Sequence, residues 1–144
     1  MFLGRYSHQM DEKGRIRIPP KYKAELGEAP FITTGTNDCL FVYAQPVFLN
    51  KFLSKLTDIE ISDLEEMDMA RIIASNAINA EEDKQGRILL PKHLIDHAGL
   101  GKNLITIGAL DHVEIWSEEA WEKYTATTTL DNVVKRIAEK RKKA

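Results

Sequence analysis

Apolar and polar residues alternate in a way that predicts short strands separated by turns and helices. Ile16 and Ile18 alternate with Arg15 and Arg17, which indicates a strand with one apolar face and one cationic face. The two prolines that follow predict a short helix over residues 21–26 that ends at a glycine. Apolar runs at residues 31–34 and 40–43 predict two further strands around a turn.

Residues 2–9 are predicted to form a short strand that leads into the first loop, and the same order of elements returns in the second half of the chain. We expect a strand at 75–78, a turn at 83–86, a strand at 87–90, a helix from Pro91 to Gly99, and strands at 104–107 and 113–116. Residues 11–19 and 83–91 share Asp, Gly, Arg, Ile and Pro at five of nine positions. A repeat this long indicates a duplicated supersecondary unit. The predicted organisation is copy 1 at 1–47, connecting helices at 48–73, copy 2 at 74–117, and C-terminal helices at 118–144.

Helical spacing predicts four further helices outside the two copies. One begins at Pro46, and a capping box at residues 62–65 predicts a second that runs to about Ile73. Ser117 is the expected N-cap of a third helix. Leu130 opens a terminal helix whose apolar residues lie on one stripe. Because exposed apolar stripes on a small domain often become subunit contacts, we expect an oligomer.

The composition predicts an ordered globular protein. The chain has 144 residues, of which 43% are hydrophobic and 29% charged, enough for one domain with a proper core. No apolar run approaches the ~18 residues of a membrane span, and no signal peptide is evident. The single cysteine, Cys39, excludes an intrachain disulfide and lies in an apolar run, which predicts a buried thiol. We expect a cytoplasmic protein without a membrane partner.

The net charge of −2 does not by itself indicate nucleic-acid binding, but the charge is unevenly distributed. Residues 11–23 carry five basic and two acidic side chains, whereas residues 57–68 carry six acidic and no basic ones. A local positive field can steer a polyanion toward one face of a protein whose net charge is negative. The acidic stretch should then face away from DNA. The basic tail at 135–143 is either a further DNA contact or a solvated helix end.

The duplicated Asp-x-x-Gly-Arg loops carry the candidate chemistry. The aspartates can accept hydrogen bonds from backbone amides, and the glycines supply positive φ, so the predicted loop-forming residues are Asp11, Gly14, Asp83 and Gly86. A purely structural reading is that each arginine pairs with the aspartate of its own loop. An arginine that projects outward can instead bind guanine O6 and N7 in a DNA major groove. The candidate DNA-binding residues are Lys13, Arg15, Arg17, Gln85 and Arg87, with Lys21 and Lys23 near flanking phosphates.

No catalytic constellation is present in the sequence. There is no Gly-x-Ser-x-Gly elbow, no phosphate-binding Gly-Lys-Ser/Thr loop and no cysteine pair for zinc. His93 and His97 are four residues apart on a predicted helix, but no third metal ligand is evident. We therefore expect neither an enzyme nor a cofactor or metal.

The loop, strand and proline of residues 11–19 resemble the AbrB-like family of swapped-hairpin DNA-binding modules. Two tandem copies in one chain are similar to the MraZ family of bacterial transcriptional regulators. The resemblance implies an α+β fold with a mainly β core. In it, two pseudo-symmetric swapped-hairpin halves form one compact barrel-like unit with flanking helices.

The resemblance also implies partners. It implies a ring-shaped homo-oligomer, an octamer or similar, that binds double-stranded DNA in the nucleoid. The expected target is a set of short tandem repeats upstream of the division and cell-wall gene cluster, with repression of the chain's own operon.

The second copy departs from the first at two cationic positions, since Gln85 replaces Lys13 and Leu89 replaces Arg17. We therefore expect the N-terminal copy to bind DNA more strongly. A different class of function remains open, in which the chain is an AbrB-like antitoxin or protein-interaction module. Its partner surface would then be the helices from Pro46 to Ile73 and from Leu130 onward.

Overall fold

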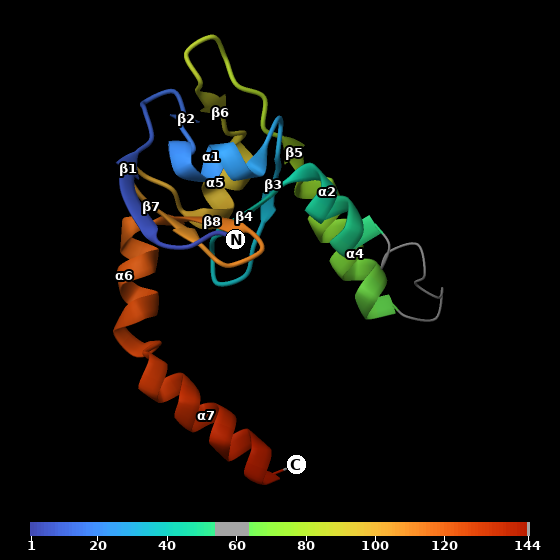
Figure 1. Ribbon diagram of the computed structural model, residues 1–144, viewed down its shortest axis with the longest axis vertical. Helices are drawn as coiled ribbons and strands as arrows, with labels where there is room; N and C mark the ends of the chain where they lie inside the picture. The colour runs from blue at the N-terminus through green and yellow to red at the C-terminus, as the bar shows by residue number, and fades with distance from the viewer. Residues whose placement is uncertain (54–63, 144) are drawn as a thin grey trace.

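A computed structural model describes residues 1–53 and 64–143 (Figure 1). The strands are β1 Arg5–Gln9, β2 Arg15–Ile16, β3 Phe31–Thr34, β4 Leu40–Tyr43, β5 Ile78–Asn79, β6 Ile88–Leu89, β7 Asn103–Gly108 and β8 Val113–Ser117. The helices are α1 Pro20–Leu26, α2 Gln45–Phe48, the π-helical turn η1 Leu49–Leu53, α4 Leu64–Asn76, α5 Lys92–Ala98, α6 Glu118–Thr127 and α7 Leu130–Lys143. The predicted capping box at 62–65 begins outside the described residues.

The two copies are interleaved in one antiparallel sheet. Its strand order is β1-β7-β8-β4-β3-β5, so each copy places its first strand beside the third strand of the other copy. The pairing of β4 with β8 joins the two copies at the centre of the sheet. If each strand is replaced by its equivalent in the other copy, the strand order read from one edge becomes the order read from the opposite edge. This is the pseudo-symmetry expected of swapped halves. Within the described residues β1 and β5 are open edges, so the expected barrel-like closure is not confirmed.

The core draws on equivalent positions of both copies. Ile16 and Ile88 are each 1% exposed, and Tyr22 of α1 and Leu94 of α5 are as deeply buried. Burying a side chain of this size contributes about 1.5–3 kcal/mol, so the two copies stabilise one shared core. Cys39 is buried as predicted, and burial raises the pKa of its thiol.

Element boundaries differ from the sequence prediction most clearly after α4. The strand expected at 75–78 is wrong at its start, because α4 continues to Asn76 and β5 begins only at Ile78. The hydroxyl of Thr33 on β3 donates to the carbonyl of Ile73 at 2.8 Å, and the side-chain amide of Asn76 donates to the carbonyl of Ile72 at 2.7 Å. These contacts satisfy the last turn of α4 and hold it against the sheet.

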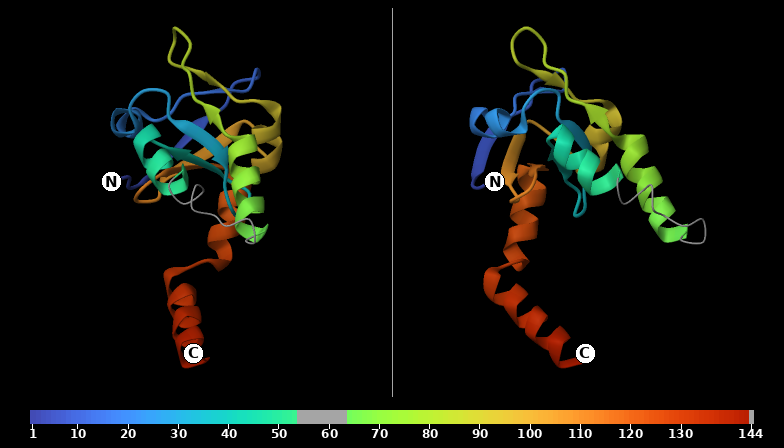
Figure 2. Two further views of the ribbon diagram at one scale, coloured as in Figure 1. Left: turned by 90° about the vertical axis from the view of Figure 1, so that its right-hand side faces the viewer. Right: turned by 45° about the vertical axis from the view of Figure 1, so that its right-hand side comes forward.

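The C-terminal helices project away from the sheet (Figure 2). The predicted cap of α6 is confirmed, since the Ser117 hydroxyl accepts a hydrogen bond from the Ala120 amide at 3.0 Å. After a break at Thr128 and Thr129, α7 extends further outward and contributes no buried residue. Among the described residues, no helix combines the length and apolar character needed to cross a membrane.

Candidate nucleic-acid interface

The two Asp-x-x-Gly-Arg loops fold in the same way. Oδ1 of Asp11 accepts the backbone amides of Lys13 and Arg15 at 2.9 Å each. In the second loop, Oδ1 of Asp83 accepts the amides of Gln85 and Arg87 at the same 2.9 Å. The glycines, Gly14 and Gly86, have φ values of 81° and 76°, in the left-handed region that favours glycine. The predicted turn-forming roles of the aspartates and glycines match this geometry.

Each motif arginine is paired with the aspartate of its own loop. Nε of Arg15 lies 2.6 Å from Oδ2 of Asp11, and Nε of Arg87 lies 2.9 Å from Oδ2 of Asp83. Only 25% and 22% of the two arginine side chains are exposed. Of the two readings that the sequence left open, the pairing of each arginine with the aspartate of its own loop describes this structure, and neither guanidinium group projects freely.

The same hydrogen bonds stabilise the charged form of the aspartates. The backbone amide of Arg15 is the largest cause of a lowered pKa at Asp11, and the backbone amide of Arg87 plays the same part for Asp83. Both carboxylates are thus ionised at neutral pH. Because Nε of each arginine is engaged, the Nη edge of the guanidinium is the part that can still meet a ligand. Within the described chain, neither guanidinium group has a hydrogen-bond acceptor other than this aspartate.

The small sheet formed by β2 and β6 brings the two loops to the same end of the molecule (Figure 1). Arg15 pairs with Leu89 and Ile16 with Ile88 in antiparallel register. Arg17 reaches across to the second loop, where its Nε donates to the carbonyl of Gln85 at 3.3 Å. The alternation predicted for residues 15–18 is confirmed, since Ile16 and Ile18 are buried and Arg17 is exposed.

A cleft of about 400 Å³ lies beside this small sheet. Arg15, Arg17 and Arg87 all line it, so three of the five predicted DNA-binding residues meet at one hollow. Lys13 and Gln85, the other two, are exposed in the turns of their loops. The sequence therefore placed its candidate residues in one region of the surface, although it did not reveal their mutual contacts.

Strand β1 forms a wall of this cleft that the sequence reasoning missed. Residues 6–9, including His8, line the cleft together with the arginines. Nε2 of His8 lies 2.6 Å from the Thr106 hydroxyl, and burial lowers the pKa of the imidazole. The position of β1 depends on its pairing with β7 from the other copy, which no local pattern discloses. The run of polar residues in a predicted strand was the one available signal.

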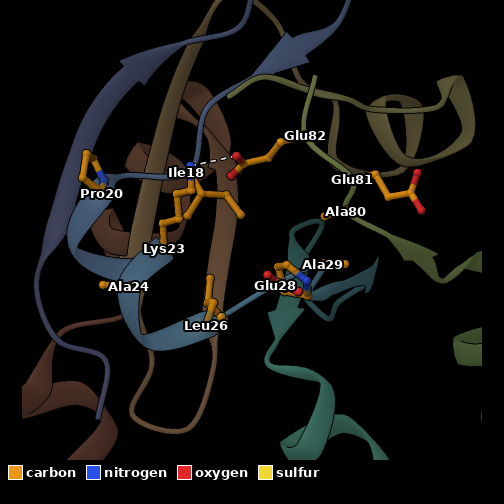
Figure 3. A pocket seen from close by; sticks show the side chains of 12 residues that line it. Ile18, Pro20, Lys23, Ala24, Leu26, Glu28, Ala29, Ala80, Glu81 and Glu82 are labelled. Carbon is orange, nitrogen blue, oxygen red and sulfur yellow. Dashed lines mark ion pairs between the residues drawn. The ribbon is translucent and has the colours of Figure 1, made fainter. Parts of the chain in front are cut away.

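Lys23, one of the predicted phosphate contacts, is engaged elsewhere. Its Nζ lies 2.7 Å from Oε2 of Glu82, at the base of the second loop. Figure 3 shows this ion pair across a groove of about 720 Å³ between α1 and residues 80–82. The groove is mostly apolar, with Ile18 and Leu26 in its lining. Lys23 therefore anchors the second loop instead of standing free.

The two histidines on α5 bond to separate carbonyls. Nε2 of His93 lies 3.2 Å from the carbonyl of Asn76, and Nε2 of His97 lies 3.0 Å from that of Gly35. In the described part of the chain, no group of three or more His, Cys, Asp or Glu side chains could hold a metal ion. Both rings thus link α5 to neighbouring segments.

Acidic and basic segments outside the loops lie far from the arginine cleft. Helix α4 carries Glu65 and Glu66 in its first turn and Asp68 after them, and it extends away from β2 and β6 (Figure 1). The basic helix α7 lies at the far end of the molecule from the same two strands (Figure 1). Within one chain, the basic tail therefore does not join the loop surface.

Comparison with known proteins gives two kinds of match. A family model described as "MraZ protein, putative antitoxin-like" matches residues 1–72 and again residues 73–141. A protein of Caldanaerobacter subterraneus subsp. tengcongensis, named "Transcriptional regulator MraZ", is 42% identical over 128 residues, which is 89% of each chain. Proteins of the same name from Leuconostoc citreum and Finegoldia magna are 41% and 37% identical, over 89% and 91% of each chain.

Proposed function

The chain belongs to the MraZ family, and from that premise we propose that it is a transcriptional regulator that binds double-stranded DNA through its paired loops. The observation that carries the proposal is the meeting of Arg15, Arg17 and Arg87 at one cleft. Two-stranded ribbons and loops at strand ends can enter a major groove. The small β2–β6 sheet presents such a ribbon at one end of the molecule.

The proposed roles follow from the charged and hydrogen-bonding groups of each side chain that are not engaged within the chain. Arg15 and Arg87 are oriented by their Nε bonds to aspartate and would present the Nη edge to guanine O6 and N7. Lys13 and Arg17 are exposed cations that would contact phosphates or neighbouring bases. Gln85 would make a polar contact from the second loop. The pairing with aspartate lowers the entropy that each arginine would lose on binding.

We propose that the target is a set of short tandem repeats upstream of the division and cell-wall gene cluster, and that binding represses the chain's own operon. A ring of identical chains, an octamer or similar, would engage several repeats at once. Effective concentration would then raise the overall affinity of loops that individually bind weakly. This gain in affinity would offset the repulsion between DNA and a chain with a net charge of −2. The protein would act in the cytoplasm, at the nucleoid.

Footprinting and titration on the DNA upstream of its own gene test the proposal. Arg15→Ala should lose affinity by about 1–3 kcal/mol for each lost base contact, and should lose preference for the site over unrelated DNA. Arg71→Ala is the matched control, because Arg71 also pairs with an aspartate but lies on α4. Equal binding by Arg15→Ala and the wild type, with an unchanged melting temperature, would exclude the role given to Arg15.

Salt dependence separates a DNA face from an unrelated basic patch. If several phosphates are neutralised together, the logarithm of affinity should fall steeply and linearly with the logarithm of salt concentration. A flat salt response would count against any DNA-binding surface.

A second candidate function rests on the words "antitoxin-like" in the description of the matching family model. In that case the chain would bind a partner protein, with the helices outside the sheet as its surface. Co-purification with a protein encoded beside its gene would favour this function. Unaltered co-purification by the Arg15→Ala variant would separate it from DNA binding.

A further inference from the structure

Among the residues that the structure describes, nothing covers one face of helix α4 or one face of helix α7. Neither contributes a buried residue, and both expose large apolar side chains. On α4, Met69 and Ile72 are 51% and 57% exposed, while on α7 Val134 and Ile137 are 55% and 46% exposed. Isolated helices shorter than ~12–15 residues are marginal in water, so a packing partner would stabilise α7, which has 14 residues and buries none of them in this chain.

The exposed residues follow the same spacing on both helices. On α7, Leu130, Val134, Ile137 and Arg141 are separated by four, three and four residues, which places them on one stripe. On α4 the same intervals give a second stripe, formed by the exposed residues Glu65, Met69 and Ile72 and by the half-buried Asn76 at the end of the helix. Two stripes with this spacing can interlock along a shared seam, as in coiled coils.

Charge fixes both the partner and the direction of packing. Helix α7 carries six basic and two acidic residues, whereas α4 carries three acidic residues and one basic residue. Two α7 helices would therefore repel each other, while α7 and α4 attract. An antiparallel arrangement opposes Arg141 to Glu65, Ile137 to Met69 and Val134 to Ile72. It also places the basic end of α7 beside the acidic first turn of α4, which the opposed helix dipoles favour.

The junction before α7 directs this contact to another molecule. The amide of Asn132 donates to the Thr129 hydroxyl at 3.2 Å, and its side-chain amide donates to the carbonyl of Thr127 at 3.0 Å. These bonds fix the angle between α6 and α7, and they hold α7 apart from α4 of the same chain (Figures 1 and 2). We propose that α7 of one copy packs antiparallel on α4 of a second copy.

Because α4 and α7 are different surfaces, the contact is heterologous. It can be reciprocated within a pair of chains or repeated from chain to chain until an assembly closes. The loops with Arg15 and Arg87 lie on neither helix, so the proposal is independent of DNA binding.

Cross-linking between two differently tagged chains tests the contact. One chain carries Ile137→Cys and the other carries Met69→Cys, and both retain Cys39, whose thiol is buried. After mixing and mild oxidation, a disulfide should join the two tags. The matched control replaces Ile137→Cys with Glu139→Cys, on the opposite face of α7, and should give little product. Equal yields from both pairs, or no disulfide from Ile137→Cys, would overturn the proposal.

Charge reversal gives an independent measurement. Arg141→Glu should shift the mass measured by light scattering toward smaller species, and addition of Glu65→Arg should restore it. Lys143→Glu makes the same charge change on the polar face of α7 and should leave the mass unchanged. Circular dichroism checks that each variant is folded. No change in mass with Arg141→Glu would overturn the proposal. In the cross-linking experiment, a single chain that carries both Ile137→Cys and Met69→Cys and forms only an internal disulfide would also overturn the proposal.

Discussion

The two Asp-x-x-Gly-Arg loops share their turn but differ at their base. Below the first loop, Met10 and Ile95 pack against the apolar core. The equivalent positions below the second loop are Glu82 and Lys23, which form an ion pair at 2.7 Å beside an open groove (Figure 3). The first loop therefore rests on apolar packing, and the second rests on a half-exposed pair of charges.

The same difference is found around the turn glycines. Gly14 is buried, and a Cβ added there would lie 3.0 Å from Cδ1 of Ile95. A Cβ added at Gly86 would lie 3.8 Å from the nearest atom, Oε2 of Glu82. Duplication has thus preserved the hydrogen bonds that shape the turn, while the contacts that hold each turn to the body have diverged. The turn of the second loop is therefore less tightly packed against the body of the protein than the turn of the first loop.

The largest expected effect is on stability, from alanine at the two turn glycines. Both positions have positive φ, which costs an alanine about 1–2 kcal/mol. Gly14→Ala must also displace Ile95, so we expect a total loss of about 2–4 kcal/mol, against about 1–2 kcal/mol for Gly86→Ala. Urea denaturation measures both. Equal losses would show that the two loops are anchored alike.

A smaller effect should appear in DNA affinity at the strand positions after the loops. Arg17→Ala removes an exposed cation and should weaken binding by roughly 1–2 kcal/mol. It should also lower the slope of log affinity against log salt by about 1 if a phosphate contact is lost. Leu89, the equivalent residue, is 63% exposed, and Leu89→Ala should leave affinity unchanged. Stronger binding by Leu89→Arg would show that the second loop engages DNA. If Arg17→Ala and Leu89→Ala behave alike, the first copy has no advantage.

The ion pair below the second loop should have a still smaller effect. Lys23 and Glu82 are 49% and 30% exposed, and such pairs contribute between 0 and about 1 kcal/mol. The double variant Lys23→Ile with Glu82→Met reproduces the residues below the first loop and should raise the melting temperature slightly. Hydrogen exchange at the Gln85 and Arg87 amides should slow in that variant. Faster exchange would contradict the view that apolar packing below a loop holds it more firmly than the Lys23–Glu82 ion pair does.

The smallest difference between the two loops is expected in how their aspartates respond to acid pH. The folded-state pKa values of Asp11 and Asp83 lie below the ordinary 3.8, because backbone amides bind the charged carboxylates. The stabilisation is therefore present above that ordinary pKa and is lost as pH falls through the lowered folded values. The Nε–H signals of Arg15 and Arg87 in NMR spectra should persist at neutral pH and fade together below pH 3.8. Widely separated titrations would show that the turn chemistry itself has diverged.

The sequence predicted elements whose signals are local. The strands at 31–34 and 40–43 have the predicted boundaries, and the Ser117 cap is present. The helix predicted from Pro91 to Gly99 is present as Lys92–Ala98, with those two residues as its caps. Local hydrogen-bonding chemistry also indicated the Asp and Gly roles in the loops. These features depend on residues within one or two turns of each other, so the pattern along the chain contains the necessary information.

Features that depend on distant partners could not be read in the same way. The end of α4 is set by contact with β3, and the Lys23–Glu82 pair joins residues from different copies. Whether the Arg15 guanidinium pairs with Asp11 or points into solvent depends on a balance of energies that the motif alone does not determine. The cleft wall from β1 likewise exists only because β1 pairs with β7.

The exchange of first strands between copies has a consequence for synthesis of the chain on the ribosome. Strand β1 emerges first, yet its partner β7 begins only at Asn103. The small sheet that presents the arginines also needs β6, which comes from the second copy. Since long-range pairing slows folding, the nascent first half must wait with unpaired strand edges until most of the polypeptide has been made. A chain truncated between the copies should therefore aggregate instead of yielding half of a regulator.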